Sequence, residues 1–175
     1  MKRFGAFLAA LTAFLSLATA EVKAADPALS AEANAAFLAE NSHKPGVVVR
    51  PSGMQYNIVK NGFGKRPTPT DTVTVNYTGT LINGKVFDGT EPQTPAQFTV
   101  NKLIPGWTEA LSLMREGDRW HLVIPADLAY GARGAGEGLI PPNQALVFDM
   151  ELLETKPAQK GPQGSESDDD ANGRQ

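Results

Sequence analysis

Residues 72–87 read TVTVNYTGTLINGKVF, and this stretch carries two signals of an antiparallel sheet. Between Thr72 and Thr78 small polar and large apolar residues alternate, which is typical of a strand with one buried face. The buried face would carry Val73, Val75 and Tyr77. Asn83-Gly84 follows, and both residues tolerate positive φ, so the pair is the strongest short-range signal for a hairpin. The stretch therefore predicts two paired strands.

The same two-residue period recurs on both sides of this hairpin. It is found at 55–60, at 119–124 with Trp120, Leu122 and Ile124 on one face, and at 145–153. One short helix is predicted at 107–114, because Pro105 suits a first helical turn and Gly117 follows the end. A sheet with one apolar face and one short helix to cover it predicts an α+β fold.

The first twenty residues form a separate unit. Lys2 and Arg3 precede an apolar run that ends before Ala18-Thr19-Ala20, which has the small-x-small form of a signal-peptidase site. We therefore expect residues 1–20 to be a signal peptide and the mature chain to be exported to the periplasm, or alternatively secreted, with no stable membrane insertion after cleavage. A second possible cut follows Ala24, and an uncleaved anchor is the other interpretation of the segment.

The mature chain divides into three parts. Residues 21–46 form an arm whose stretch 27–42 has helical composition, with Ser30 as the N-cap and an apolar side made by Leu29, Ala33, Ala36 and Phe37. Residues 47–156 form the β-rich domain. Residues 157–175 contain no large apolar side chain, so we expect a disordered acidic tail.

Composition excludes several chemistries. The 175 residues include no cysteine, which rules out disulfides and thiol nucleophiles, and the net charge of -3 argues against nucleic acid as a partner. The two histidines, His43 and His121, have no second histidine at ligand spacing. We therefore expect no metal and no cofactor.

A set of large side chains sits at predicted strand ends and around the helix. These are Tyr77, Phe87, Phe98, Ile104, Trp107, Tyr130, Ile140 and Phe148. Few polar groups accompany them, chiefly Asp88 and the Tyr130 hydroxyl. By spacing alone they are either ordinary core residues or the lining of an apolar pocket, and composition does not distinguish the two.

Several blocks of sequence together resemble the FKBP-type peptidyl-prolyl cis/trans isomerases in order and spacing. They are VNYTG at 75–79, GKVFD at 84–88, IPGW at 104–107, AYG at 129–131, LIPP at 139–142 and LVFDMELL at 146–153. Residues 37–41 (FLAEN) and 44–47 (KPGV) look like the exported bacterial subgroup that includes the macrophage infectivity potentiator proteins. Those relatives carry a long dimerising helical region, of which this chain has only the last stretch, so we expect a monomer.

The resemblance implies a half-wrapped antiparallel sheet with the short helix against its concave face and a pocket between them. Trp107 would form the floor of the pocket, and Asp88 would sit beside a tyrosine of the wall. The walls would be Tyr77, Phe87, Phe98 and Phe148.

The resemblance also implies residues for the edge of the pocket. Leu103 and Ile104 would line the lip, with the Ile104 backbone N–H available to a substrate, and Tyr130 would offer its hydroxyl at the rim. Ile140 would contribute from the loop 131–142, and Ala135 or Gly136 would occupy the part of the rim where some family members have an aromatic residue or a histidine.

The activity implied by the resemblance is rotation of X-Pro peptide bonds in proline-containing polypeptides, without a covalent step. The resemblance also implies binding of the macrolides that FKBP proteins bind. Two other interpretations stay open from the residues. The domain could be a holdase-like binding module that uses the same pocket with little turnover, or a structural protein whose aromatic residues are only core.

Overall fold

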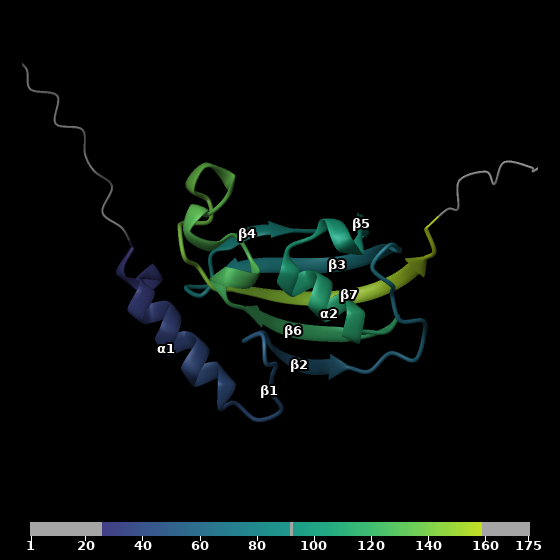
Figure 1. Cartoon of the computed structure of the whole chain (residues 1–175), viewed down its shortest axis with the longest axis horizontal. Coiled ribbons are helices and arrows are strands. Elements are labelled where there is room, and N and C mark those ends of the chain that lie inside the picture. Colours follow the sequence, from purple (N-terminus) through teal and green to yellow (C-terminus); the bar gives the residue numbers. More distant parts are fainter. Residues whose placement is uncertain (1–25, 92, 159–175) are drawn as a thin grey trace, which may run out of the picture.

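The computed structural model of the chain describes residues 26–91 and 93–158, and an antiparallel sheet is its main element (Figure 1). The strand order is β1-β2-β6-β7-β3-β4, and β5 also pairs with β3. Every one of these pairings is antiparallel. The strands are β1 (Val48–Val49), β2 (Gln55–Lys60), β3 (Thr72–Leu81), β4 (Val86–Gly89), β5 (Ala96–Thr99), β6 (Arg119–Ile124) and β7 (Leu146–Lys156).

Residues 72–87 form β3, the first part of β4 and the turn between them, as predicted. Gly84 has a φ of 82°, and the Leu81 N–H donates to the Lys85 carbonyl at 2.9 Å, which closes the hairpin. On its other side β3 pairs with β7, with Val75 opposite Leu152. Both of these residues are fully buried, so the alternating pattern correctly identified the inner face of the sheet.

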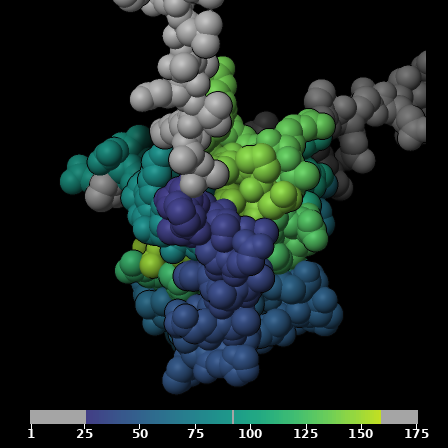
Figure 2. All heavy atoms as spheres, turned by 90° about the vertical axis from the view of Figure 1, so that its left-hand side faces the viewer, coloured from purple at the N-terminus to yellow at the C-terminus, as the bar shows by residue number. Residues whose placement is uncertain are grey.

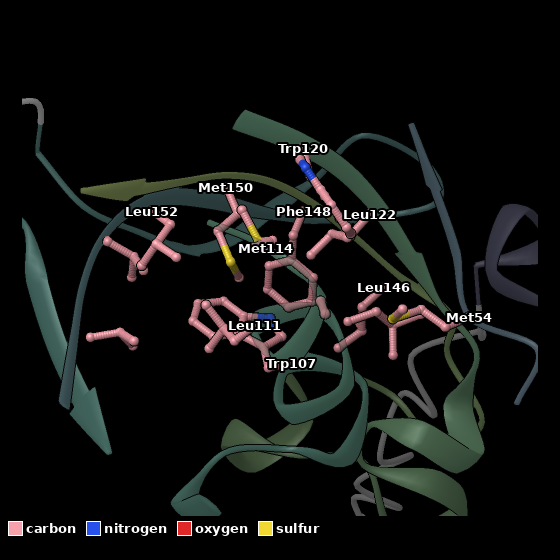
Figure 3. Close-up of a cluster of buried hydrophobic side chains, with 14 of the residues drawn as sticks. Met54, Trp107, Leu111, Met114, Trp120, Leu122, Leu146, Phe148, Met150 and Leu152 are labelled. Carbon is pink, nitrogen blue, oxygen red and sulfur yellow. The ribbon is translucent and has the colours of Figure 1, made fainter. Parts of the chain in front are cut away.

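Helix α2 (Pro105–Leu113) covers that inner face, and the α+β prediction is confirmed. The helix begins at Pro105, slightly earlier than the predicted start. Gly106 lies so close to the sheet that a Cβ there would clash with Ile124 Cγ2. Figure 3 shows Trp107 of this helix beside Phe148 of the sheet within the buried cluster. The core therefore lies between one helix and one sheet.

Helix α1 (Ala31–Ser42) follows the short 3-10 turn η1 (Pro27–Leu29) and lies across one end of the sheet (Figures 1 and 2). Ser30 is the N-cap, as predicted, and its hydroxyl oxygen accepts from the Ala33 N–H at 3.1 Å. Of the predicted apolar side, Leu29 packs against the core and Ala33 and Phe37 are half-buried, but Ala36 is exposed, and the buried residues of α1 are Asn34 and Asn41. Hydrogen bonding therefore decides which side of this helix faces the domain.

The other regular elements are short 3-10 turns: η2 (Val100–Lys102), η3 (Ala126–Leu128), η4 (Gly131–Arg133) and η5 (Gly136–Gly138). None of the helices within 26–91 and 93–158 has the length and apolarity needed to cross a membrane. The predicted signal peptide at 1–20 lies outside the described residues, and so does the predicted tail from residue 159 onward.

Candidate active site

A cavity of about 120 Å³ opens between α2 and the inner face of the sheet. Strands β3, β4, β5 and β7 contribute to it, together with the start of α2 and the connection after β6. Nine of the ten site residues expected from the sequence line this cavity: Tyr77, Phe87, Asp88, Phe98, Leu103, Ile104, Trp107, Tyr130 and Phe148. The fold thus gathers side chains that lie far apart in the sequence.

Trp107 is buried at the centre of the aromatic set. Its ring centroid lies 4.9 Å from that of Tyr77, 5.7 Å from that of Phe98 and 5.2 Å from that of Phe148, each at a nearly perpendicular angle. Edge-to-face contacts of this kind are favourable because the positive ring edge meets the negative face. The rings of Tyr77, Phe98 and Phe148 thus pack around Trp107 as apolar walls of the cavity.

Asp88 and the Tyr77 hydroxyl form the polar part of the site. The hydroxyl donates to Asp88 Oδ2 at 2.7 Å, so Asp88 lies beside Tyr77. Burial, followed by this hydrogen bond and the negative charge of Asp88, raises the pKa of Tyr77 far above its usual range. Burial and the same charge also raise the pKa of Tyr130. Both hydroxyls therefore remain protonated donors at neutral pH.

The lip of the cavity is built by the start of α2. The Ile104 carbonyl accepts from the N–H groups of Trp107 and Thr108, at 3.0 and 3.1 Å, and this makes Ile104 the N-cap. Pro105 follows with its restricted φ, which suits a first helical position. The Ile104 peptide is therefore held in one orientation at the edge of the cavity, next to Leu103.

Gly79 is a residue whose role the sequence analysis missed. A Cβ at this position of β3 would lie 2.7 Å from Phe87 Cζ and 2.8 Å from Phe148 Cε1. Two aromatic walls of the cavity thus approach the backbone where a side chain would stand. A glycine inside a strand pattern is itself a signal of close approach, so this role could have been found from the sequence.

Ile140 is placed differently from the other expected site residues. It is 6% exposed and belongs to the hydrophobic core, and it does not line the cavity. Its backbone pairs with Ala135, with N–H to carbonyl distances of 2.9 and 3.0 Å in the two directions. Ala135, expected at the rim, packs against the core as well. The loop that contains both residues therefore folds back onto the domain.

The cavity offers apolar walls, two protonated tyrosine hydroxyls and one carboxylate. Within residues 26–91 and 93–158 no three His, Cys, Asp or Glu side chains are grouped as a metal site would require. Apolar walls with a few hydrogen-bonding groups suit a reaction that depends on desolvation and orientation of a bound group.

Two family models match the chain. The model of the "FKBP-type peptidyl-prolyl cis-trans isomerase" matches residues 64–153, and the model of the domain amino-terminal to such isomerases matches residues 6–58. The chain belongs to the FKBP family. The resemblance first seen in the short sequence blocks is thereby confirmed, and the first model covers the cavity residues from Tyr77 to Phe148.

Curated relatives agree with this FKBP assignment. The chain is 56% identical over 124 residues to "Outer membrane protein MIP" of Legionella longbeachae, covering 70% of this chain and 53% of the relative. It is 52% identical over 119 residues to the FKBP-type 22 kDa peptidyl-prolyl cis-trans isomerase of Escherichia coli, covering 67% and 57%. The matched part of the chain therefore spans somewhat more than half the length of these two relatives.

A crystal structure of a peptidyl-prolyl cis-trans isomerase from Pseudomonas syringae pv. tomato has the same FKBP fold. It superposes with a TM-score of 0.69 at 40% sequence identity, covering 76% of this chain and 98% of that one. The likeness extends over nearly the whole of that protein, so the sheet, the covering helix and their connections are those of an FKBP domain.

Proposed function

We propose that this protein is a peptidyl-prolyl cis/trans isomerase that accelerates rotation of X-Pro bonds in polypeptides. The observation that carries the proposal is the aromatic cavity around Trp107, with its Tyr77–Asp88 hydrogen bond, in a chain of the FKBP family. The names of the relatives support the same activity.

The cavity suits this reaction because X-Pro rotation needs no covalent catalyst. Amide resonance makes the barrier about 18–20 kcal/mol, and the planar amide is more polarised than the twisted one. A water-poor apolar pocket disfavours the planar form more than the twisted form, which is preferential binding of the transition state. An acceleration of about 10⁴ requires only about 5–6 kcal/mol.

In this proposal the residues have separate roles. Trp107 is the floor under the proline ring, the surrounding aromatic side chains exclude water, and the Ile104 N–H and Tyr130 hydroxyl donate to substrate carbonyls. Tyr130 is 40% exposed, which suits a donor at the rim. Asp88 orients Tyr77 through their hydrogen bond.

Two further expected residues act at the margin of the site. Leu103 borders the bound chain from the lip of the cavity. Ile140 supports the pocket from the core, and it contacts substrate only if its loop moves.

The test is an isomerisation assay on short X-Pro peptides, using exchange NMR or a protease-coupled readout, with purified residues 21–175. Asp88→Leu should lower kcat/KM by at least about tenfold, because it removes both the charge and the anchor of Tyr77. Tyr130→Phe should lower it about two- to tenfold, as expected for one hydrogen bond.

Tyr56→Phe is the matched control for the tyrosine variant. Tyr56 stacks on Trp120 outside the cavity, with 4.3 Å between ring centroids, so its hydroxyl should be dispensable for turnover. Wild-type kcat/KM in folded Asp88→Leu and Tyr130→Phe would refute the site.

A binding module without catalysis is the alternative outcome of the same assay. It would appear as a wild-type protein that binds X-Pro peptides, measured by tryptophan fluorescence to which Trp107 contributes, and leaves their exchange rate unchanged.

We also propose that macrolides of the kind FKBP proteins bind occupy this cavity. Saturating macrolide should then inhibit the isomerase and change the tryptophan fluorescence. An unaffected isomerisation rate would count against macrolide binding in this cavity.

We further propose that the mature protein is a monomer exported from the cytoplasm. Support for the monomer comes from α1, whose two buried side chains are engaged by the domain of the same chain. Support for export comes from the signal-like sequence of residues 1–20 and from the name of the Legionella relative. Light scattering of residues 21–175 and the N-terminal sequence of the exported protein test these two points.

A further inference from the structure

The described arm, residues 26–42, is attached to the domain by two buried asparagines of α1. Asn34 is 5% exposed and Asn41 is 4% exposed, and they are the buried residues of that helix. Seven positions separate them, so they lie on one side of the helix, two turns apart. Buried amides require hydrogen-bond partners, and each asparagine finds a glutamine of the domain, Gln144 or Gln55.

The first asparagine fastens the arm to the end of the loop that follows Tyr130. Asn34 Nδ2 donates to Gln144 Oε1 at 3.1 Å, and Asn34 Oδ1 accepts from the Ala145 N–H at 2.8 Å. Gln144 Nε2 in turn donates to the Leu29 carbonyl of the arm at 2.9 Å. Three hydrogen bonds thus join the arm to two consecutive residues of the domain.

The end of this loop is bonded back to its beginning. The Asn143 N–H donates to the Gly131 carbonyl at 2.8 Å. Gly131 directly follows Tyr130, which lines the cavity. A path of hydrogen bonds and adjoining residues therefore runs from Asn34 through 143–145 to the position next to the rim tyrosine. Figure 2 shows α1, in purple, lying beside the green segment that contains this loop.

The arm also contacts the tip of the β3–β4 hairpin. Asn83 Nδ2, at the tip of the β3–β4 hairpin, donates to Asp26 Oδ2 at 2.9 Å. Strand β4 leaves this hairpin and carries Phe87 and Asp88 into the cavity. The beginning of the arm is therefore bonded to two segments, the β3–β4 hairpin and the end of the loop after Tyr130, that each adjoin residues of the cavity lining.

The second asparagine makes a similar attachment elsewhere. Asn41 Nδ2 donates to Gln55 Oε1 at 2.8 Å, and Gln55 Nε2 donates to the Leu38 carbonyl at 2.9 Å. Gln55 begins β2, a strand that is described in full and contributes nothing to the cavity lining. Asn41 thus has the same residue type, helix, burial and glutamine partner as Asn34. It holds a different part of the domain, and it lacks the bonds that Asn34 makes to the Ala145 N–H and to the Ser30 and Leu29 carbonyls.

We infer that Asn34 is a positioning residue for the isomerase site, which it orders by holding the loop 131–145 and, through that loop, the Tyr130 rim. The inference rests on the proposed function. When the loop is released, only a fraction of the molecules have the rim in place, and the apparent affinity for substrate falls by that fraction. If the fraction of molecules with an ordered rim falls to about one quarter, KM rises about fourfold. The value of kcat stays nearly unchanged, because bound substrate restores the order.

The experiment compares Asn34→Ala with Asn41→Ala in residues 21–175. Both substitutions increase helix propensity, so a loss of intrinsic propensity is not the cause of an effect. Asn34→Ala also removes the bonds from Asn34 Nδ2 to the Ser30 and Leu29 carbonyls, which Gln144→Ala leaves intact. We expect Asn34→Ala to raise KM for an X-Pro peptide about three- to fivefold, with kcat within about twofold of wild type. Amide hydrogen exchange should quicken at residues 131–145. Asn41→Ala should retain the wild-type KM and quicken exchange in β2 instead.

Gln144→Ala is a second route to the same contact, and it leaves the residues of α1 intact. If Asn34 acts through Gln144, the fold increase in KM of the double variant Asn34→Ala/Gln144→Ala should be well below the product of the fold increases of the two single variants. The inference is overturned if Asn34→Ala and Asn41→Ala have equal KM, or if exchange at 131–145 is unchanged in Asn34→Ala. An inactive wild type refutes the proposed function instead, and the exchange experiment then still decides whether Asn34 holds the loop.

Discussion

The two α-helices within residues 26–91 and 93–158 are attached to the same sheet by opposite means. Helix α2 buries Gly106, Trp107, Ala110 and Leu111 against the inner face, whereas the buried residues of α1 are Asn34 and Asn41. Apolar burial is non-directional and scales with area, so α2 builds both the core and the walls of the cavity. Amide hydrogen bonds are directional and add less net stability, so α1 holds particular segments in place without forming the core.

The largest loss of stability should follow the removal of an aromatic side chain that packs against α2. Phe148→Ala removes a buried side chain that packs against Trp107, and such losses cost about 3–5 kcal/mol. We expect a fall of this size in the free energy of unfolding by urea, together with a loss of kcat/KM in the fraction that is folded. Phe63→Ala is the control, because Phe63 is 92% exposed. Similar losses in both variants would contradict the assignment of Phe148 to the core and cavity.

A smaller change should push α2 away from the sheet without removing any contact. Gly106→Ala places a methyl group against Ile124 Cγ2, and Ile124 is fully buried. Overpacking of this kind costs about 1–3 kcal/mol. We expect lower stability in urea and weaker binding of X-Pro peptide in the cavity.

Gly84→Ala is the comparison for this variant. Its new methyl group would have no described atom within 4 Å, but its φ of 82° strains the backbone. It should therefore lose stability while retaining peptide affinity. If Gly106→Ala also retains wild-type affinity, the spacing between α2 and the sheet does not shape the cavity.

Removal of the whole arm should cost less than the loss of Phe148. A chain that begins at His43 loses the two asparagine attachments but keeps the residues of the core cluster other than Leu29. The six hydrogen bonds between the arm and the domain contribute about 0.5–1.5 kcal/mol net each, and the conformational entropy lost when the arm is ordered opposes most of this gain. We therefore expect a cooperative domain that is less stable by about 1–3 kcal/mol. Circular dichroism during urea unfolding measures this. A truncated chain that does not fold would show that the arm is part of the folding unit.

The smallest expected effect concerns pH and the hydrogen bond between Tyr77 and Asp88 beside α2. Burial and the hydrogen bond to Asp88 raise the pKa of Tyr77 above its ordinary value of 10.0, which applies in the unfolded chain. The stability gained from the neutral phenol is therefore fully present below pH 10 and is lost as the pH rises further. We expect the stability difference between wild type and Tyr77→Phe to be constant from about pH 6 to about pH 9 and to shift against wild type above about pH 10. A constant difference up to about pH 11 would contradict this.

Local pattern in the sequence was sufficient for the sheet, the hairpin and the family. Strict alternation at 72–78 and Asn83-Gly84 leave one arrangement of paired strands with a buried inner face, because the face of a side chain follows from its position in the strand. The list of cavity residues followed from the family resemblance, since spacing alone could not separate a pocket from a core. The folded chain was needed to place Ile140 in the core and outside the cavity lining.

The attachment of α1 could not be read from local pattern. Composition favoured the side with Leu29, Ala33, Ala36 and Phe37, and an isolated helix gives no reason to bury an asparagine. Gln144 and Gln55 change that preference, because they offer complementary amides at the places where Asn34 and Asn41 meet the domain. These partners are 110 and 14 positions away in the chain. Hydrogen bonds depend on distance and angle between such groups, and those are set only when the folded domain brings them together.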